Sequence, residues 1–233
     1  MALVLMGAPR VIAHAYVLTF DDVRAALVSG APVPEGRLDS AQVAYGHAIE
    51  WRSDDPSFRR DRALVVRRML RLADVNAGET SASAEPRCNP ACLKRAARDD
   101  LRVHAGLAPA DGFGWALYAD AGLEIDGDMS SALPALRLAR LTAPRRASAL
   151  LMQFRITMQR WDRVPEEMRD HSLRYVGAFW LNNDLRPFLI DVYLHSGYAA
   201  RAAFREVMAL NPRHLEQFDH MMLSGEPVPR RLR

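Results

Sequence analysis

Apolar residues recur along most of the chain with the 3.6-residue period of an amphipathic helix. In the segment 57–73 the apolar positions share one side at about 100° per residue; they are Phe58, Val65, Val66, Met69 and Leu72. The same period is present in the segments 38–51, 93–107, 147–161, 166–180, 185–197 and 198–210. We find no alternating strand pattern bounded by hairpin signals. The pattern therefore predicts an all-α fold of about ten helices in antiparallel pairs.

One internal stretch lacks this period. Residues 76–89 are small and polar and include a proline, which is typical of a flexible loop. A surface loop is favoured over a domain boundary, so we expect N-terminal helices in 1–75 and a helical region in 90–233 to form one continuous stack.

The first fifteen residues, MALVLMGAPRVIAHA, allow two interpretations. Ala13-His14-Ala15 fits a small-x-small cleavage site of a secretory signal. However, no positive charge precedes Leu3, and Pro9-Arg10 interrupt the apolar stretch. A first helix of the fold is favoured, and the signal stays an alternative. The compartment is left open, with the cytoplasm slightly favoured over the periplasm.

A spaced motif begins within the segment IDGD, at its third residue. It reads G-D-x3-A-x3-L-x2-A-x4-P and consists of Gly127, Asp128, Ala132, Leu136, Ala139 and Pro144. Gly and Asp favour a tight turn between two helices. The two alanines would let a neighbouring helix approach closely, and the leucine would fill the space between helices. Upstream, Trp115 and Ala119 offer a large and a small residue four positions apart on the preceding helix.

The small-large-small spacing recurs in three other places. The recurrences are Ala97, Leu101, His104 and Pro109; Ala200, Phe204, Val207 and Pro212; and Ala41, Tyr45, Ala48 and Ser53. Pro109 and Pro144 are 35 residues apart, and Pro144 and Pro212 are 68 apart, close to one and two repeats of about 34. The chain thus resembles the tetratricopeptide repeat over roughly residues 37–212. This resemblance implies a right-handed superhelical stack of helix pairs, with a C-terminal capping helix after Pro212 whose inner face carries Leu215, Phe218 and Met222.

The repeats are degenerate. Residues 145–178 have the length of a repeat without its small residues, and the interval from Ser53 to Pro109 is about 22 residues too long. Because Pro134 is tolerated only near a helix start, we expect its helix to begin near Ser130 or Ser131. The arrangement is also similar to helical-repeat proteins that alphaproteobacteria encode with polysaccharide export systems, which implies a setting in the bacterial envelope.

The net charge of +3 with a pI near 9.1 permits an anionic partner without requiring one. Lys94 is the only lysine, so arginine carries nearly all the positive charge. Arg60, Arg67 and Arg71 cluster on one side of the helix in 57–73, away from its apolar side. We expect these arginines to be exposed and to form part of a binding surface, with a plain solvated helix face as the alternative. Arg155 and Gln159, four apart in a later helix, would line the same side if that helix is the inner one.

The two cysteines, Cys88 and Cys92, flank Asn89-Pro90-Ala91. Asn89 is expected to cap a helix that begins at Pro90 and places Cys92 in its first turn. A disulfide between the two cysteines and two inert thiols are equally favoured, and a redox or metal role is less favoured because zinc sites need more ligands.

Motifs for catalysis, metal binding or phosphate loops are missing from the sequence. There is no G-x-S-x-G elbow, Walker loop, G-x-G-x-x-G or H-E-x-x-H, and the seven histidines do not cluster. We therefore predict no catalytic residue, metal or cofactor. The favoured function is a non-enzymatic scaffold or adaptor that binds a protein or peptide in the concave groove of a solenoid. A protein that binds a polyanion, such as acidic polysaccharide or nucleic acid, is the alternative, and an enzyme with a site hidden from sequence is the third. The oligomeric state is left open.

Overall fold

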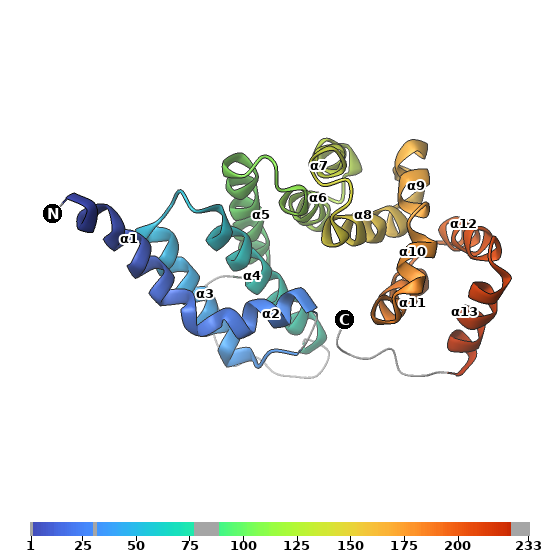
Figure 1. The fold of residues 1–233 in the computed structure, drawn as a ribbon, viewed down its shortest axis with the longest axis horizontal. Coiled ribbons are helices and arrows are strands. Elements are labelled where there is room, and N and C mark those ends of the chain that lie inside the picture. The colour runs from blue at the N-terminus through green and yellow to red at the C-terminus, as the bar shows by residue number, and fades with distance from the viewer. Residues whose placement is uncertain (1, 30–31, 77–88, 225–233) are drawn as a thin grey trace.

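The computed structural model describes residues 2–29, 32–76 and 89–224. These residues form thirteen α-helices and three short 3-10 helices and include no β-strand, which confirms the predicted all-α class. Figure 1 shows the helices following one another in chain order along the long axis of the molecule. Within the described residues, no helix has both the length and the apolar character needed to cross a membrane.

The helices are joined mostly by short turns. The N-terminal half contains α1 (Ala2–Val17), α2 (Asp21–Ser29), α3 (Glu35–Trp51), α4 (Pro56–Asn76), α5 (Pro90–Leu107) and α6 (Gly112–Asp126). The C-terminal half contains α7 (Met129–Thr142), α8 (Ala147–Gln159), α9 (Glu166–Leu173), α10 (Val176–Leu181), α11 (Arg186–Leu194), α12 (Tyr198–Ala209) and α13 (Pro212–Ser224). The 3-10 helices are Leu18–Phe20, Trp161–Arg163 and Asn183–Leu185.

Consecutive helices pack against each other, most extensively α4 against α5 and α6 against α7. The hydrophobic core is accordingly divided into four clusters that follow the chain. They lie between α1 and α4, between α4 and α6, between α6 and α9, and between α8 and α13. Each cluster is built from neighbouring elements, as expected for a chain whose helices stack in sequence order.

The turn between α6 and α7 has the structure that its sequence predicts. Gly127 adopts the left-handed conformation (φ 64°), and its N–H donates to the carbonyl of Leu123 at the end of α6. A residue with a side chain would be strained there. Asp128 then caps α7, its carboxylate accepting a 3.0 Å hydrogen bond from the backbone N–H of Ser130. The Gly-Asp pair therefore ends one helix and starts the next.

The small-large-small positions face the core in four helices, α3, α5, α7 and α12. Eleven of the twelve side chains are buried, and only Val207 is partly exposed. The buried ones are Ala41, Tyr45, Ala48, Ala97, Leu101, His104, Ala132, Leu136, Ala139, Ala200 and Phe204. The recurrent spacing therefore marks core positions.

Some local expectations need correction. Helix α7 begins at Met129, earlier than predicted, because Asp128 caps it, so Pro134 is its sixth residue and not part of its first turn. Residues 145–178 form α8, a 3-10 turn, α9 and the start of α10, which is less regular than one helix pair. The C-terminal helix α13 agrees with the prediction, with Phe218 fully buried and Leu215 and Met222 packed against the same cluster.

The segment between α4 and α5 is described only at its ends. Asn89 caps α5 as predicted, its side chain accepting a 2.8 Å hydrogen bond from the N–H of Cys92. Most of the predicted loop, including Cys88, lies outside the described residues. The pairing of Cys88 with Cys92 therefore stays a prediction.

Candidate anion-binding pocket

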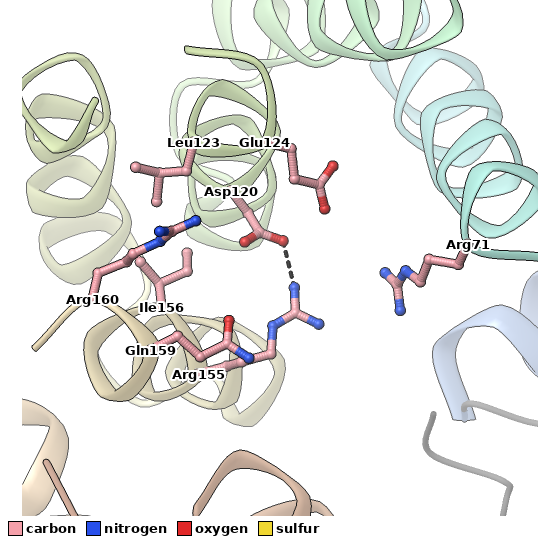
Figure 2. A pocket seen from close by; sticks show the side chains of 8 residues that line it. All are labelled: Arg71, Asp120, Leu123, Glu124, Arg155, Ile156, Gln159 and Arg160. Atoms are coloured by element: carbon pink, nitrogen blue, oxygen red, sulfur yellow. Dashed lines mark hydrogen bonds and ion pairs between the residues drawn. The ribbon is translucent and has the colours of Figure 1, made fainter. Parts of the chain in front are cut away.

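A pocket of about 220 Å³ lies where α4, α6 and α8 approach one another. It is lined by Arg71 from α4; Asp120, Leu123 and Glu124 from α6; and Arg155, Ile156, Gln159 and Arg160 from α8 and its C-terminal end. Figure 2 shows Arg71 reaching from α4 toward the side chains that α6 and α8 contribute from the opposite side. The lining is mostly charged, with one apolar patch made by Leu123 and Ile156.

Helix α6 is held in place by close contacts at its N-terminal end. Asp111 caps it by accepting a 3.2 Å hydrogen bond from the N–H of Phe113. A Cβ at Gly112 would lie 2.7 Å from the carbonyl oxygen of Ala139 in α7, and a Cβ at Gly114 would overlap the ring of His104 in α5. Only glycine permits these approaches. They fix α6 between α5 and α7 and so position its acidic residues beside α4 and α8.

The charged groups behind the pocket form one ion-pair network. Arg67 is almost completely buried, with 3% of its side chain exposed. Its Nη2 donates to Asp120 Oδ2 and Glu124 Oε1, both at 2.5 Å. Arg155 donates to the same Asp120 oxygen. Asp120 therefore joins an arginine of α4 to an arginine of α8.

This network controls the charge state of Asp120. Burial opposes ionisation of its carboxyl, but the positive charges of Arg67 and Arg155 outweigh burial and lower the pKa to about 2. Burial would likewise lower the pKa of Arg67, whereas Asp120 and Glu124 raise it above its ordinary value. At neutral pH Asp120 is therefore a carboxylate that lies between the guanidinium groups of Arg67 and Arg155.

Two further cations face the same pocket without a partner. Arg71 and Arg160 form no ion pair with any residue that the structure describes. The protein around the pocket partly shields the guanidinium of the exposed Arg71 from water, and the charges of Arg67 and Arg155 repel it, so its pKa falls to about 10. Arg71 therefore stays protonated at neutral pH. Together with Arg160, it gives the pocket more arginines than acidic residues.

The structure brings together three of the five predicted binding residues, Arg71, Arg155 and Gln159, in this pocket. The expectation that Arg60, Arg67 and Arg71 are exposed is wrong for Arg67, because α6 covers it and supplies two carboxylates. Arg60 is only partly exposed, and Arg71 is exposed. Whether the pocket binds a partner stays a prediction.

The remaining predicted residue, Arg60, belongs to a separate cluster at the other end of α4. Its Nε donates to Asp61 at 3.0 Å, and its Nη1 to Asp111 at 3.5 Å. Asp111 also accepts from Arg146 at 2.8 Å and lies 3.0 Å from Nε2 of the buried His104. The His104 Nδ1 is 2.8 Å from the carbonyl oxygen of Pro56, so this cluster ties the start of α4 to α5 and α6. Arg60 therefore stabilises the contact between α4 and the start of α6 and does not line the pocket.

Sequence reasoning missed Asp120, Glu124 and Arg160. A signal for the first was present, because Asp120 is the only charged residue in the first twelve positions of the otherwise apolar α6. A buried acid in an apolar helix usually has a charged partner. The sequence does not say which arginine it meets, since Arg67 is 53 residues earlier and Arg155 is 35 residues later.

In the described part of the chain, no group of three or more His, Cys, Asp or Glu side chains is placed to hold a metal ion. No family model, curated protein or solved structure matches this chain. Its function is therefore argued from the pocket and the fold.

Proposed function

We propose that this protein is a non-enzymatic helical-repeat scaffold that binds a protein or peptide partner, with an acidic group of the partner held in the pocket between α4, α6 and α8. The observation that carries the proposal is the pair of unpartnered arginines, Arg71 and Arg160, which face a pocket already lined by Arg155 and Gln159. Arginine recognises carboxylates and phosphates through paired N–H donors.

The chemistry of the lining supports binding over catalysis. Among its residues, none is a serine, cysteine, histidine or lysine that could act as a nucleophile. Asp120 would be a poor general base, because its two ion pairs and its pKa of about 2 keep it ionised and weakly basic. The pocket instead offers hydrogen-bond donors and a small apolar wall, the features of a recognition site.

Arginines elsewhere on the described chain fall into two groups. Many have acidic partners, for example Arg37 with Asp22, Arg62 with Asp100, Arg98 with Asp126 and Arg205 with Asp219. Others, such as Arg95, Arg145 and Arg174, are exposed and form no ion pair with a described residue. The local acidic group is proposed because Arg71 and Arg160 line one pocket together.

A tetratricopeptide-like superhelix is part of this proposal. Its support is the burial of the small-large-small positions in α3, α5, α7 and α12. A second support is the extensive packing of α5 on α4 and of α7 on α6, the helix that precedes each of them. Such a stack presents a long, rigid surface to a partner.

Site-specific photo-crosslinking tests the proposed function. A photo-crosslinking amino acid replaces Gln159 at the pocket or, as a control, Glu206, which is exposed on α12. In the native host we expect a protein adduct of one defined mass from the Gln159 position, none from the Glu206 position, and loss of the adduct when Arg71→Glu is added.

The alternative polyanion function predicts a different result. Adducts at the Gln159 position would then contain nucleic acid or polysaccharide, and binding would weaken steeply with salt because counterions are released. Adducts of that kind, or equal adducts from both positions, would contradict the proposal.

A further inference from the structure

We propose that the pocket between α4, α6 and α8 is specific for a phosphate dianion, carried as a phosphate monoester on a side chain of the partner. This inference rests on the proposed function for the source of the group. The observation that carries it is the position of two unpartnered arginines, Arg71 on α4 and Arg160 at the end of α8, in one pocket. The ion-pair network beside them already contains equal numbers of arginines and carboxylates.

The first step is the charge balance of the site. Arg67 and Arg155 are matched by Asp120 and Glu124, since all four belong to one network. Arg71 and Arg160 are not matched by any described residue. The site therefore has two uncompensated positive charges. A phosphate monoester, with close to two negative charges at neutral pH, would balance them, whereas a carboxylate would leave one in excess.

The second step is the excess of hydrogen-bond donors. The guanidinium of Arg71 has no hydrogen-bond acceptor among the described residues. Gln159 adds an amide to the lining. Phosphate presents more acceptor oxygens than a carboxylate does, which suits a site rich in donors.

The third step is electrostatic. Loss of hydration and, after it, repulsion by Arg67 and Arg155 lower the pKa of Arg71. An anion bound beside Arg71 would offset both effects and favour the charged guanidinium. Because a ligand that binds only the folded state stabilises it, the free energy of unfolding should rise with the logarithm of the ligand concentration above Kd.

The last step concerns size and attachment. The volume of about 220 Å³ leaves room for more than the anion itself, so the short carbon chain that bears the phosphate would fit beside it.

Calorimetry at constant ionic strength tests the specificity, with inorganic phosphate, acetate, capped phosphoserine and capped glutamate as probes. We expect phosphoserine to bind at least tenfold more tightly than glutamate, and phosphate to bind while acetate does not. Arg71→Gln and Arg160→Gln should each weaken phosphoserine binding at least tenfold. Arg213→Gln, which changes an exposed arginine of α13 away from the pocket, should leave it unchanged.

Each other outcome has a definite meaning. Equal affinity for glutamate and phosphoserine, or no binding of phosphate and phosphoserine, would overturn the inference. Binding of inorganic phosphate without phosphoserine would overturn its assignment to a partner side chain. A protein adduct at Gln159 together with no phosphate binding would leave the scaffold proposal standing and reject this inference. Phosphoserine binding without a protein adduct would reject the scaffold proposal and the partner as the source of the phosphate, and would leave only the phosphate specificity of the pocket.

Discussion

At the scale of single residues, Arg67 and Arg71 show how far neighbours on one helix can differ. They are four positions apart on α4, one turn of the helix, yet Arg67 is buried with two carboxylates and Arg71 is exposed without a described partner. Burial of an arginine is tolerated only where carboxylates replace its hydration. The same residue type therefore holds the fold together at one position and remains available for a ligand at the next turn.

This difference predicts a large effect of one substitution at Arg67 and a small effect of the same substitution at Arg71. Arg67→Met should lower the free energy of unfolding by about 3–5 kcal/mol, because it leaves Glu124 without this arginine and Asp120 with Arg155 alone. Arg71→Met is the matched control and should change it by less than about 1 kcal/mol, because no described ion pair is lost. Urea denaturation monitored by circular dichroism measures both. Equal losses in the two variants would show that Arg71 is also structural.

At the scale of elements, α6 contributes the acidic residues of the pocket and packs against α5, α7 and α8. The glycines of α6 differ in how much space surrounds them. Gly114 meets the His104 ring so closely that no side chain fits, whereas Gly122 has open space where a Cβ would lie. Both are in a helix, where glycine is less favourable than alanine by about 0.5–1 kcal/mol.

The two glycines therefore predict opposite signs for one substitution. Gly114→Ala should destabilise the protein by about 1–3 kcal/mol, because His104 must move and its contacts to Asp111 and Pro56 are disturbed. Gly122→Ala should stabilise it by about 0.5–1 kcal/mol through helix propensity. Thermal unfolding of the two variants and of the unsubstituted protein measures these changes in stability. A stabilised Gly114→Ala variant would mean that α6 approaches α5 less closely than described.

At the scale of the whole molecule, the core consists of successive clusters along a stack of helices (Figure 1). The C-terminal cluster is closed by α13, where Phe218 packs against Trp180, Tyr193 and Phe204 with ring centroids 4.9–5.8 Å apart. In such a stack, contacts link each element mainly to its neighbours, so damage at one end should stay local.

Substitutions in two separate core clusters test this. Phe218→Ala should cost about 3–5 kcal/mol of local stability, because it leaves a cavity beneath α13. Amide hydrogen exchange should then rise in α11, α12 and α13 and stay unchanged in α4 and α5. Leu101→Ala, in the cluster between α4 and α6, should give the reverse distribution. A uniform rise across all helices in both variants would show that the stack unfolds as one cooperative unit.

Much of the architecture was determined by the sequence alone, because it depends on local interactions. The 3.6-residue period predicted the helices, Gly127 and Asp128 predicted the turn between α6 and α7, and Asn89 predicted the start of α5. Each is a contact between residues within four positions of one another, so its signal is contained in a short segment. The buried small-large-small positions were readable for the same reason, since one helix face repeats at fixed spacing.

Only the tertiary structure decided which arginines are buried and which form a pocket. Arg67 meets Asp120 and Glu124 from 53 and 57 residues away, and Arg155 reaches Asp120 from the other side. No local spacing records these pairings, because they depend on the distance and rotation of α4, α6 and α8 relative to one another. The charge left over at Arg71 and Arg160 depends on the same packing, since an arginine is free for a ligand only after the fold has paired the others.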